Sequence, residues 1–199
     1  TLRREYNERS IGHAGTLDPA ASGLLIVGIG SGTKLLSEYR ELPKRYRATI
    51  LLGETTDTLD SEGRVTDAVV SADVTEDELE QATADLVGIT VLPVPIYAAV
   101  KQGGEPLYKK ARRGEAVVPP MREMEVFATK LLDHYMREYH CVVVIECDVA
   151  HGVYVRSLAR EFGRRLGYPA RLDGLRRTHI GPYSVADARS VGVARRRKL

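Results

Sequence analysis

The chain has 199 residues, of which 43% are hydrophobic, and its formal net charge is +2 at pH 7. This length and apolar content suffice for a buried core in one domain, which excludes a disordered or fibrous protein. The chain contains no run of about 18 apolar residues and no signal-peptide pattern. We therefore expect a cytoplasmic protein with no membrane association.

The first distinctive stretch is GHAGTLDPAASG, residues 12–23, in which Asp18 precedes Pro19 and glycines lie on both sides. Asp followed by Pro is typical of a helix start, so one interpretation makes Asp18 a helix cap. The other makes it an exposed, rigid acid, because the glycines permit a ligand to approach closely and His13 adds a polar ring nearby. At this point both interpretations stay open.

The next elements alternate between strands and short helices. The apolar run 23–30 predicts a buried strand, 33–41 a short helix, and 44–53 a half-buried strand with Tyr46 on its apolar face. A core tyrosine and a base-stacking tyrosine both fit this placement of Tyr46.

The second half of the chain begins with a capping-box pattern. Thr75 and Glu78 predict a helix that runs through Leu86 and ends at Gly88. The later patterns predict a helix at 107–114, strands at 123–132 and 138–150, and a helix at 153–167. Long strands that follow one another without a helix favour antiparallel pairing. The expected fold is therefore α+β: a mixed, mainly antiparallel central sheet with flanking helices.

Neither the cysteines nor the acidic stretch predicts a metal site. Cys141 and Cys147 lie in one predicted strand, roughly 20 Å apart, so they cannot form a disulfide with each other. Asp57, Asp60 and Glu62 do not follow the spacing of a calcium loop, and they predict an acidic surface turn.

Charge is distributed unevenly along the chain. Residues 53–92 contain eleven acids and one base, whereas residues 151–199 contain twelve bases and three acids. A basic end of this kind indicates either a polyanionic partner or a solvated arginine surface. Arg176 and Arg177 are accordingly either phosphate contacts or a solvated pair.

Arginines at every fourth position form a stripe on the predicted helix at 153–167. Arg160 and Arg164 are expected on its solvated face. Arg156 lies in the first turn of this helix, where it can point into a cleft.

Four stretches, taken in order, resemble the TruB family of pseudouridine synthases. They are GHAGTLDPAASGLLIVGIGSGTK, KRYRATILLGETTDTLDSEG, IYAAVKQGGEPLYKKARRG and GVYVRSLAREFGRRLG followed by LRRTHIGPYS. The resemblance implies a catalytic domain built on a central antiparallel sheet, which isomerises the T-loop uridine at position 55 of tRNA without cofactor or metal. It also implies an N-terminal strand and a C-terminal PUA-type domain outside this sequence, so residues 1–199 are expected to be the catalytic domain.

The resemblance assigns roles to six residues. Asp18 matches the catalytic aspartate, and the matched substrate-binding residues are His13, Tyr46, Tyr154, Arg156 and Leu175. A single carboxylate is enough for this reaction, because it can serve as the nucleophile at either the uracil ring or the sugar. A flipped uridine also needs a stacking aromatic ring and cations, and Arg156 is expected to pair with Asp18.

The resemblance implies a stand-alone, monomeric enzyme that binds the T-arm of tRNA without an obligatory protein partner. The alternative is an RNA-binding subunit of the same family that acts only in a guide-RNA, H/ACA-like particle. A third hypothesis, a hydrolase or phosphotransferase with an Asp nucleophile, needs a metal-binding acid cluster or a second activated base. The sequence offers neither.

Overall fold

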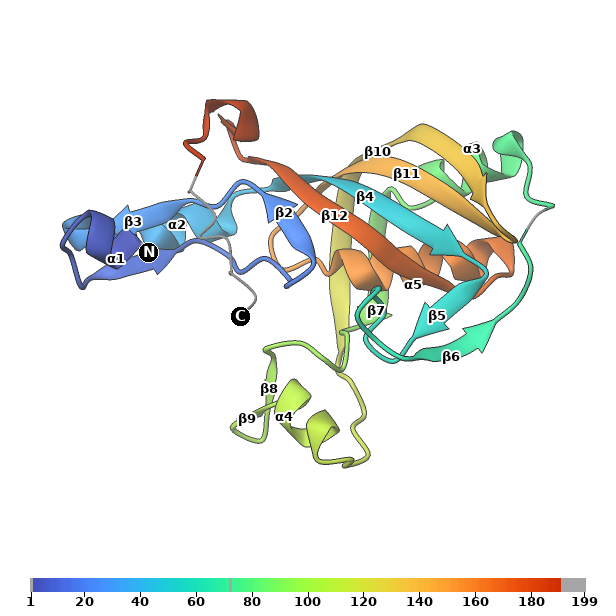
Figure 1. The fold of residues 1–199 in the computed structure, drawn as a ribbon, viewed down its shortest axis with the longest axis horizontal. Coiled ribbons are helices and arrows are strands. Elements are labelled where there is room, and N and C mark those ends of the chain that lie inside the picture. Colours follow the sequence, from blue (N-terminus) through green and yellow to red (C-terminus); the bar gives the residue numbers. More distant parts are fainter. Residues whose placement is uncertain (1, 72, 191–199) are drawn as a thin grey trace, which may run out of the picture.

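A computed structural model describes residues 2–71 and 73–190 of the chain. Figure 1 shows a twisted central sheet, an arm formed by the N-terminal elements, and a small lobe below the sheet. The order of strands in the sheet is β13 (Tyr183–Ser184), β12 (Ala170–Ile180), β4 (Lys44–Leu52), β11 (His140–Val149), β10 (Met121–Arg137) and β7 (Gly88–Pro93). These neighbours pair antiparallel, and β2 (Ala21–Gly23) joins β12 in parallel. The predicted fold class is confirmed.

Two helices cover one face of this sheet and form the core with it. They are α3 (Glu76–Ala84) and α5 (Val155–Leu166). The expected alternation along β4 is confirmed, because Ala48, Ile50 and Leu52 are fully buried in this core. Leu51 is buried too, on the other face, so β4 is apolar on both sides along its second half.

The capping box at the start of α3 is confirmed. The Thr75 amide donates to the Glu78 carboxylate over 2.8 Å, and the Glu78 amide donates to Thr75 Oγ1 over 3.3 Å. The helix ends at Ala84, slightly before the predicted Leu86, since the amide of Leu86 donates to Thr83 in a tightened last turn.

The prediction of one buried strand at 23–30 is wrong. β2 ends at Gly23, whose φ is +109°, and β3 (Val27–Ile29) pairs with β1 (Ile11–His13) in a separate two-stranded sheet. The chain leaves the main sheet here because the left-handed backbone at Gly23 redirects it. The arm is completed by α1 (Leu2–Glu5), the 3-10 helix η1 (Gly30–Leu35) and α2 (Leu36–Glu41).

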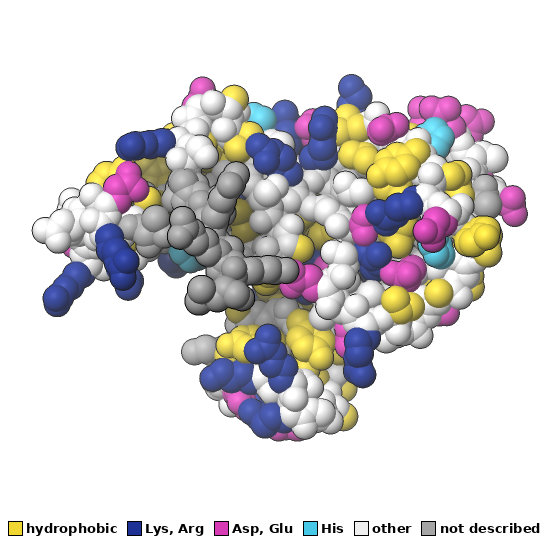
Figure 2. Space-filling model, viewed as in Figure 1, with side chains coloured by type: hydrophobic (Ala, Val, Ile, Leu, Met, Phe, Trp, Pro, Cys, Tyr) yellow, Lys and Arg dark blue, Asp and Glu magenta, His cyan; other side chains and the backbone are white. Residues whose placement is uncertain are grey.

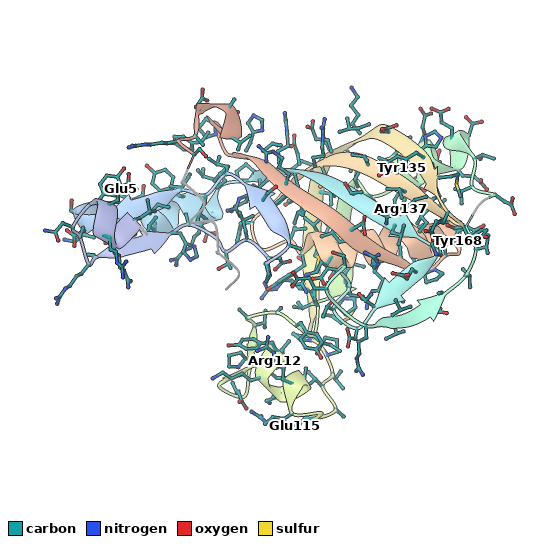
Figure 3. All side chains as sticks on the ribbon, in the orientation of Figure 1. Glu5, Arg112, Glu115, Tyr135, Arg137 and Tyr168 are labelled. Atoms are coloured by element: carbon teal, nitrogen blue, oxygen red, sulfur yellow. The ribbon has the colours of Figure 1, made fainter. Side chains whose placement is uncertain are left out.

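A lobe between β7 and β10 stands apart from the sheet. It contains β8 (Lys101–Gln102), β9 (Glu105–Pro106) and α4 (Leu107–Arg112). In Figure 3, Arg112 and Glu115 mark this lobe, Glu5 marks the arm, and Arg137 and Tyr168 mark the far end of the sheet. The remaining elements are the hairpin of β5 (Glu54–Thr56) with β6 (Val65–Ala68), and η2 (Val185–Asp187).

The two cysteines lie in β11, as predicted, and both are buried and free. Burial raises the pKa of the Cys147 thiol to about 12. No helix in residues 2–71 and 73–190 is long and apolar enough to cross a membrane.

Candidate active site

Asp18 lies in a β-turn on the loop between β1 and β2. Its carbonyl oxygen accepts a hydrogen bond from the amide of Ala21 over 2.9 Å, with Pro19 at the second position of the turn. No helix begins here, so the interpretation of Asp18 as a helix cap is wrong. The side chain is 37% exposed, and the turn therefore presents a part-exposed acid on a rigid backbone.

Arg156 holds one flank of this carboxylate. It is the second residue of α5, and its side chain is only 5% exposed. Arg156 NH2 donates to Asp18 Oδ1 over 3.2 Å, while Nε lies 2.8 Å from Oδ2 but out of line for a hydrogen bond. The predicted pairing of Asp18 with Arg156 is confirmed, and the contact fixes the direction in which the carboxylate points.

Backbone carbonyls of two loops accept hydrogen bonds from Arg156. Its NH1 donates to the carbonyl of Thr58 over 3.0 Å, and its NH2 also donates to the carbonyl of Tyr97 over 3.3 Å. Asp60 Oδ2 lies 3.5 Å from Arg156 NH1. These contacts bring the β5–β6 turn and the segment after β7 to the same arginine.

The prediction of an acidic surface turn is wrong for Asp60. Its side chain is 13% exposed, and Oδ1 accepts hydrogen bonds from Thr58 Oγ1 and from the amide of Glu62. The turn is folded onto β12, where the amide of Leu172 donates to the carbonyl of Leu59. Asp60 therefore belongs to the site, behind Arg156.

Tyr46 and Tyr154 both lie within electrostatic reach of Asp18, whose charge adds to the raised pKa of each phenol. Burial is the main cause of the raised pKa in both, opposed by Arg177 at Tyr46 and by Arg122 at Tyr154. The Arg122 guanidinium also lies over the Tyr154 ring, 5.9 Å from its centroid. The site thus places the Asp18 carboxylate near two partly buried aromatic rings.

Leu175 lies beside Asp18, whereas the His13 side chain makes no polar contact with the other predicted site residues. Leu175 lines a small pocket together with Asp18 and Asp60. His13 is exposed on β1, and its side chain makes no hydrogen bond or ion pair within the part of the chain that the structure describes. The role of His13 stays a prediction.

Some of the arginines that were expected on the surface are exposed, and others are buried. Arg164 is 71% exposed, as expected, but Arg160 is half-buried and burial lowers its pKa. Arg176 is exposed whereas Arg177 is only 1% exposed, so the prediction of a phosphate-contacting or solvated pair is wrong for Arg177. Adjacent residues of a strand point to opposite faces, which explains the difference.

Within the described ranges, no group of three His, Cys, Asp or Glu side chains could hold a metal ion.

Solved structures share this fold. A chain of the "Crystal Structure of a Cbf5-Nop10-Gar1 Complex" matches 92% of this chain with a TM-score of 0.67 and 26% sequence identity, and the match covers 44% of that chain. A chain of "Structure of H/ACA RNP bound to a substrate RNA containing 2'-deoxyuridine" matches with a TM-score of 0.64 and 23% identity. The fold that brings Asp18 beside Arg156 is thus shared with a chain of the Cbf5-Nop10-Gar1 complex.

The sequence identifies the family. Residues 3–155 match the TruB family pseudouridylate synthase (N terminal domain), and the chain therefore belongs to the TruB family. It is 38% identical over 190 residues to tRNA pseudouridine synthase B of Mycobacterium bovis (strain BCG / Pasteur 1173P2), and 40% identical over 195 residues to that of Paenarthrobacter aurescens (strain TC1). These matches cover 95% and 96% of this chain but 63% and 62% of the relatives, so the chain spans less than two thirds of their length.

Proposed function

We propose that this chain isomerises uridine to pseudouridine in tRNA, at the T-loop uridine 55, without a cofactor and with Asp18 as the nucleophile. The observation that carries the proposal is the Asp18–Arg156 pair: a part-exposed carboxylate on a rigid turn, oriented by a buried guanidinium. Membership of the TruB family and the names of the relatives support the choice of reaction and of tRNA as substrate.

The reaction breaks the N1–C1′ bond of uridine, turns the base and joins C5 to C1′. The hydrogen on C5 then leaves to solvent as a proton and N1 takes up a proton, so the RNA keeps its composition. Asp18 attacks either the uracil ring or the sugar and is released when the new bond has formed. Arg156 keeps the carboxylate aimed during the rearrangement, since its own position is fixed by the carbonyls of Thr58 and Tyr97.

The substrate uridine must leave the RNA stack to reach Asp18. In the proposed complex, the Tyr46 ring stacks on the flipped uracil, while Tyr154 and Leu175 line the pocket for it. His13 contacts the bases displaced from the T-loop, beyond the turn that carries Asp18. Residues 1–199 form the catalytic domain, and the protein acts as a monomer in the cytoplasm, where its tRNA substrate is located.

Tritium at C5 of uracil reports this reaction directly. Protein mixed with a tRNA transcript labelled at uracil C5, and with nothing else, should release tritium from the T-loop position and leave the RNA intact. A hydrolase would shorten the RNA or free a base. Asp18→Asn should fold and bind tRNA but release no tritium, because the amide keeps the size and loses the nucleophile.

Asp67→Asn is the matched control, since Asp67 is exposed on β6 and makes no contact with the site. It should turn over as the unmutated chain does. If Asp18→Asn also turned over at that rate, the assignment of the nucleophile would be wrong. Release that needs added guide RNA and protein partners would instead support the alternative, a subunit of a guide-RNA particle.

A further inference from the structure

Arg177 is a fully buried arginine that the proposed chemistry does not use. It lies in β12, is 1% exposed, and has no carboxylate within ion-pair distance among residues 2–71 and 73–190. Its charge therefore remains inside the protein without the acid that usually accompanies a buried guanidinium. Burying a charge without an opposite charge costs free energy of folding. The hydrogen bonds of Arg177 indicate its role in the structure.

The guanidinium joins the two ends of the loop that carries Asp18. Nε donates to the carbonyl of Leu24 over 2.8 Å, and NH2 donates to the carbonyl of Gly15 over 3.1 Å. The acceptors lie three residues before Asp18 and six residues after it. One side chain of the central sheet thus closes the base of the loop.

The backbone of Arg177 holds the same loop. Its carbonyl accepts a hydrogen bond from the amide of Leu24 over 2.8 Å, and its Cα is paired with Gly23 in the parallel contact of β12 with β2. A Cβ atom on Gly23 would overlap this carbonyl. The loop therefore approaches β12 too closely to shift without breaking these bonds.

We propose that Arg177 is a positioning residue: it fixes the Asp18 loop on the sheet, and so determines the turnover rate, not the affinity for tRNA. The second part rests on the proposed function. A displacement of a reacting group by about 1 Å can cost about 100-fold in rate. Since Arg177 is buried, the RNA cannot reach it, and its replacement should leave binding unchanged.

The test uses Arg177→Lys, which keeps the charge but cannot reach both carbonyls, and Arg177→Met, which removes the charge. Circular dichroism first establishes that the variants are folded. Amide hydrogen exchange is then measured on the folded variants. Amides of residues 15–23 should exchange at least about tenfold faster than in the unmutated chain, with those of β4 and β11 unchanged. In the tritium assay kcat should fall at least about tenfold and KM should stay within about twofold. Arg164→Lys, at an exposed position of α5, should change neither.

Several outcomes would overturn the proposal. They are unchanged exchange in the loop, faster exchange over the whole sheet, a loss that appears in KM alone, and failure of both variants to fold, which would make Arg177 a general stabilising residue. If the unmutated chain releases no tritium, the proposed function fails, whereas the exchange measurement still decides whether Arg177 holds the loop.

Discussion

Tyr46 is the residue at which core packing and substrate contact compete. It packs against both hydrophobic clusters of the sheet and also lies within electrostatic reach of Asp18. Replacement by alanine would open a cavity, so a loss of activity in that variant would not separate the two roles.

We expect Tyr46→Phe to keep most of the activity and Tyr46→Leu to lose about 10- to 100-fold, because stacking on a base contributes about 1 to 3 kcal/mol and needs an aromatic ring. Both variants fill most of the space, so their melting temperatures should be similar. Tritium release by folded protein and thermal unfolding measure the two effects. A leucine variant as active as the phenylalanine variant would make Tyr46 a core residue only.

At the scale of elements, Gly23 decides how closely β2 approaches β12. Gly23→Ala should destabilise the chain by more than about 3 kcal/mol, because the residue has a positive φ and its Cβ would meet the Arg177 backbone. Gly32→Ala is the control, since nothing lies within 4 Å of a Cβ added there. Denaturant unfolding measures both. Equal stabilities would show that β2 can move away from β12 without cost.

Helix α5 depends on a buried acid for its attachment to α3. Glu161 accepts hydrogen bonds from Arg164 and Arg165, and Arg165 also donates to the carbonyl of Asp85 just after α3. The hydrogen bonds from Arg164 lower the pKa of Glu161 below its ordinary value of 4.5. The stabilisation is therefore present above pH 4.5 and is lost as the pH falls through the lowered pKa.

Glu161→Gln should lower the free energy of unfolding by about 2 kcal/mol at pH 7, because charged hydrogen bonds are lost. The difference from the unmutated chain should shrink as the pH falls below 4.5 and through the lowered pKa of Glu161, where the carboxylate takes up a proton. Urea unfolding at pH 7 and at a series of acidic pH values measures it. A difference that does not change with pH would mean that the charge of Glu161 is unimportant.

Local patterns predicted the elements whose signals lie within a few residues. The capping box at Thr75, the alternation along β4 and the first-turn position of Arg156 were all visible in the sequence. The carbonyls of Thr58 and Tyr97 were not, because every residue has a carbonyl and only the fold selects which ones meet Arg156. The burial of Arg177 was not predicted, because no strand was expected at β12, and only alternation along that strand separates buried Arg177 from exposed Arg176.

At the scale of the whole molecule, the described part of the predicted basic end is not a continuous free surface, and residues 195–198 of that end lie outside the described residues. Several arginines after residue 151 are internally paired, including Arg164, Arg165 and Arg171. Figure 2 shows Lys and Arg side chains gathered on the lobe around α4 and on the arm. Among the described residues, the lobe and the arm are therefore accessible places for contact with a polyanion.

Replacing the exposed Lys109 and Arg112 of α4 with glutamine should weaken tRNA binding and lower its salt dependence. Each phosphate contact contributes about 0.7 to 0.9 to the slope of log K against log salt concentration, so the slope should fall by about 1.5. The control removes two charges from exposed Lys130 and Arg137 on β10 and should change little. Titration at several salt concentrations measures both. Equal slopes for the two double variants would exclude the lobe from the RNA-binding surface.

The contacts of Arg156 also constrain how the chain can fold. This side chain reaches residues 138, 98 and 59 positions away along the sequence, at Asp18, Thr58 and Tyr97. Contacts between segments so far apart form only after the intervening chain has been ordered, because closing long loops costs entropy before any contact compensates for it. The acid and its arginine therefore meet late, when the sheet is already complete. We therefore expect partly folded states to lack the Asp18–Arg156 contact, which forms only once α5 has docked.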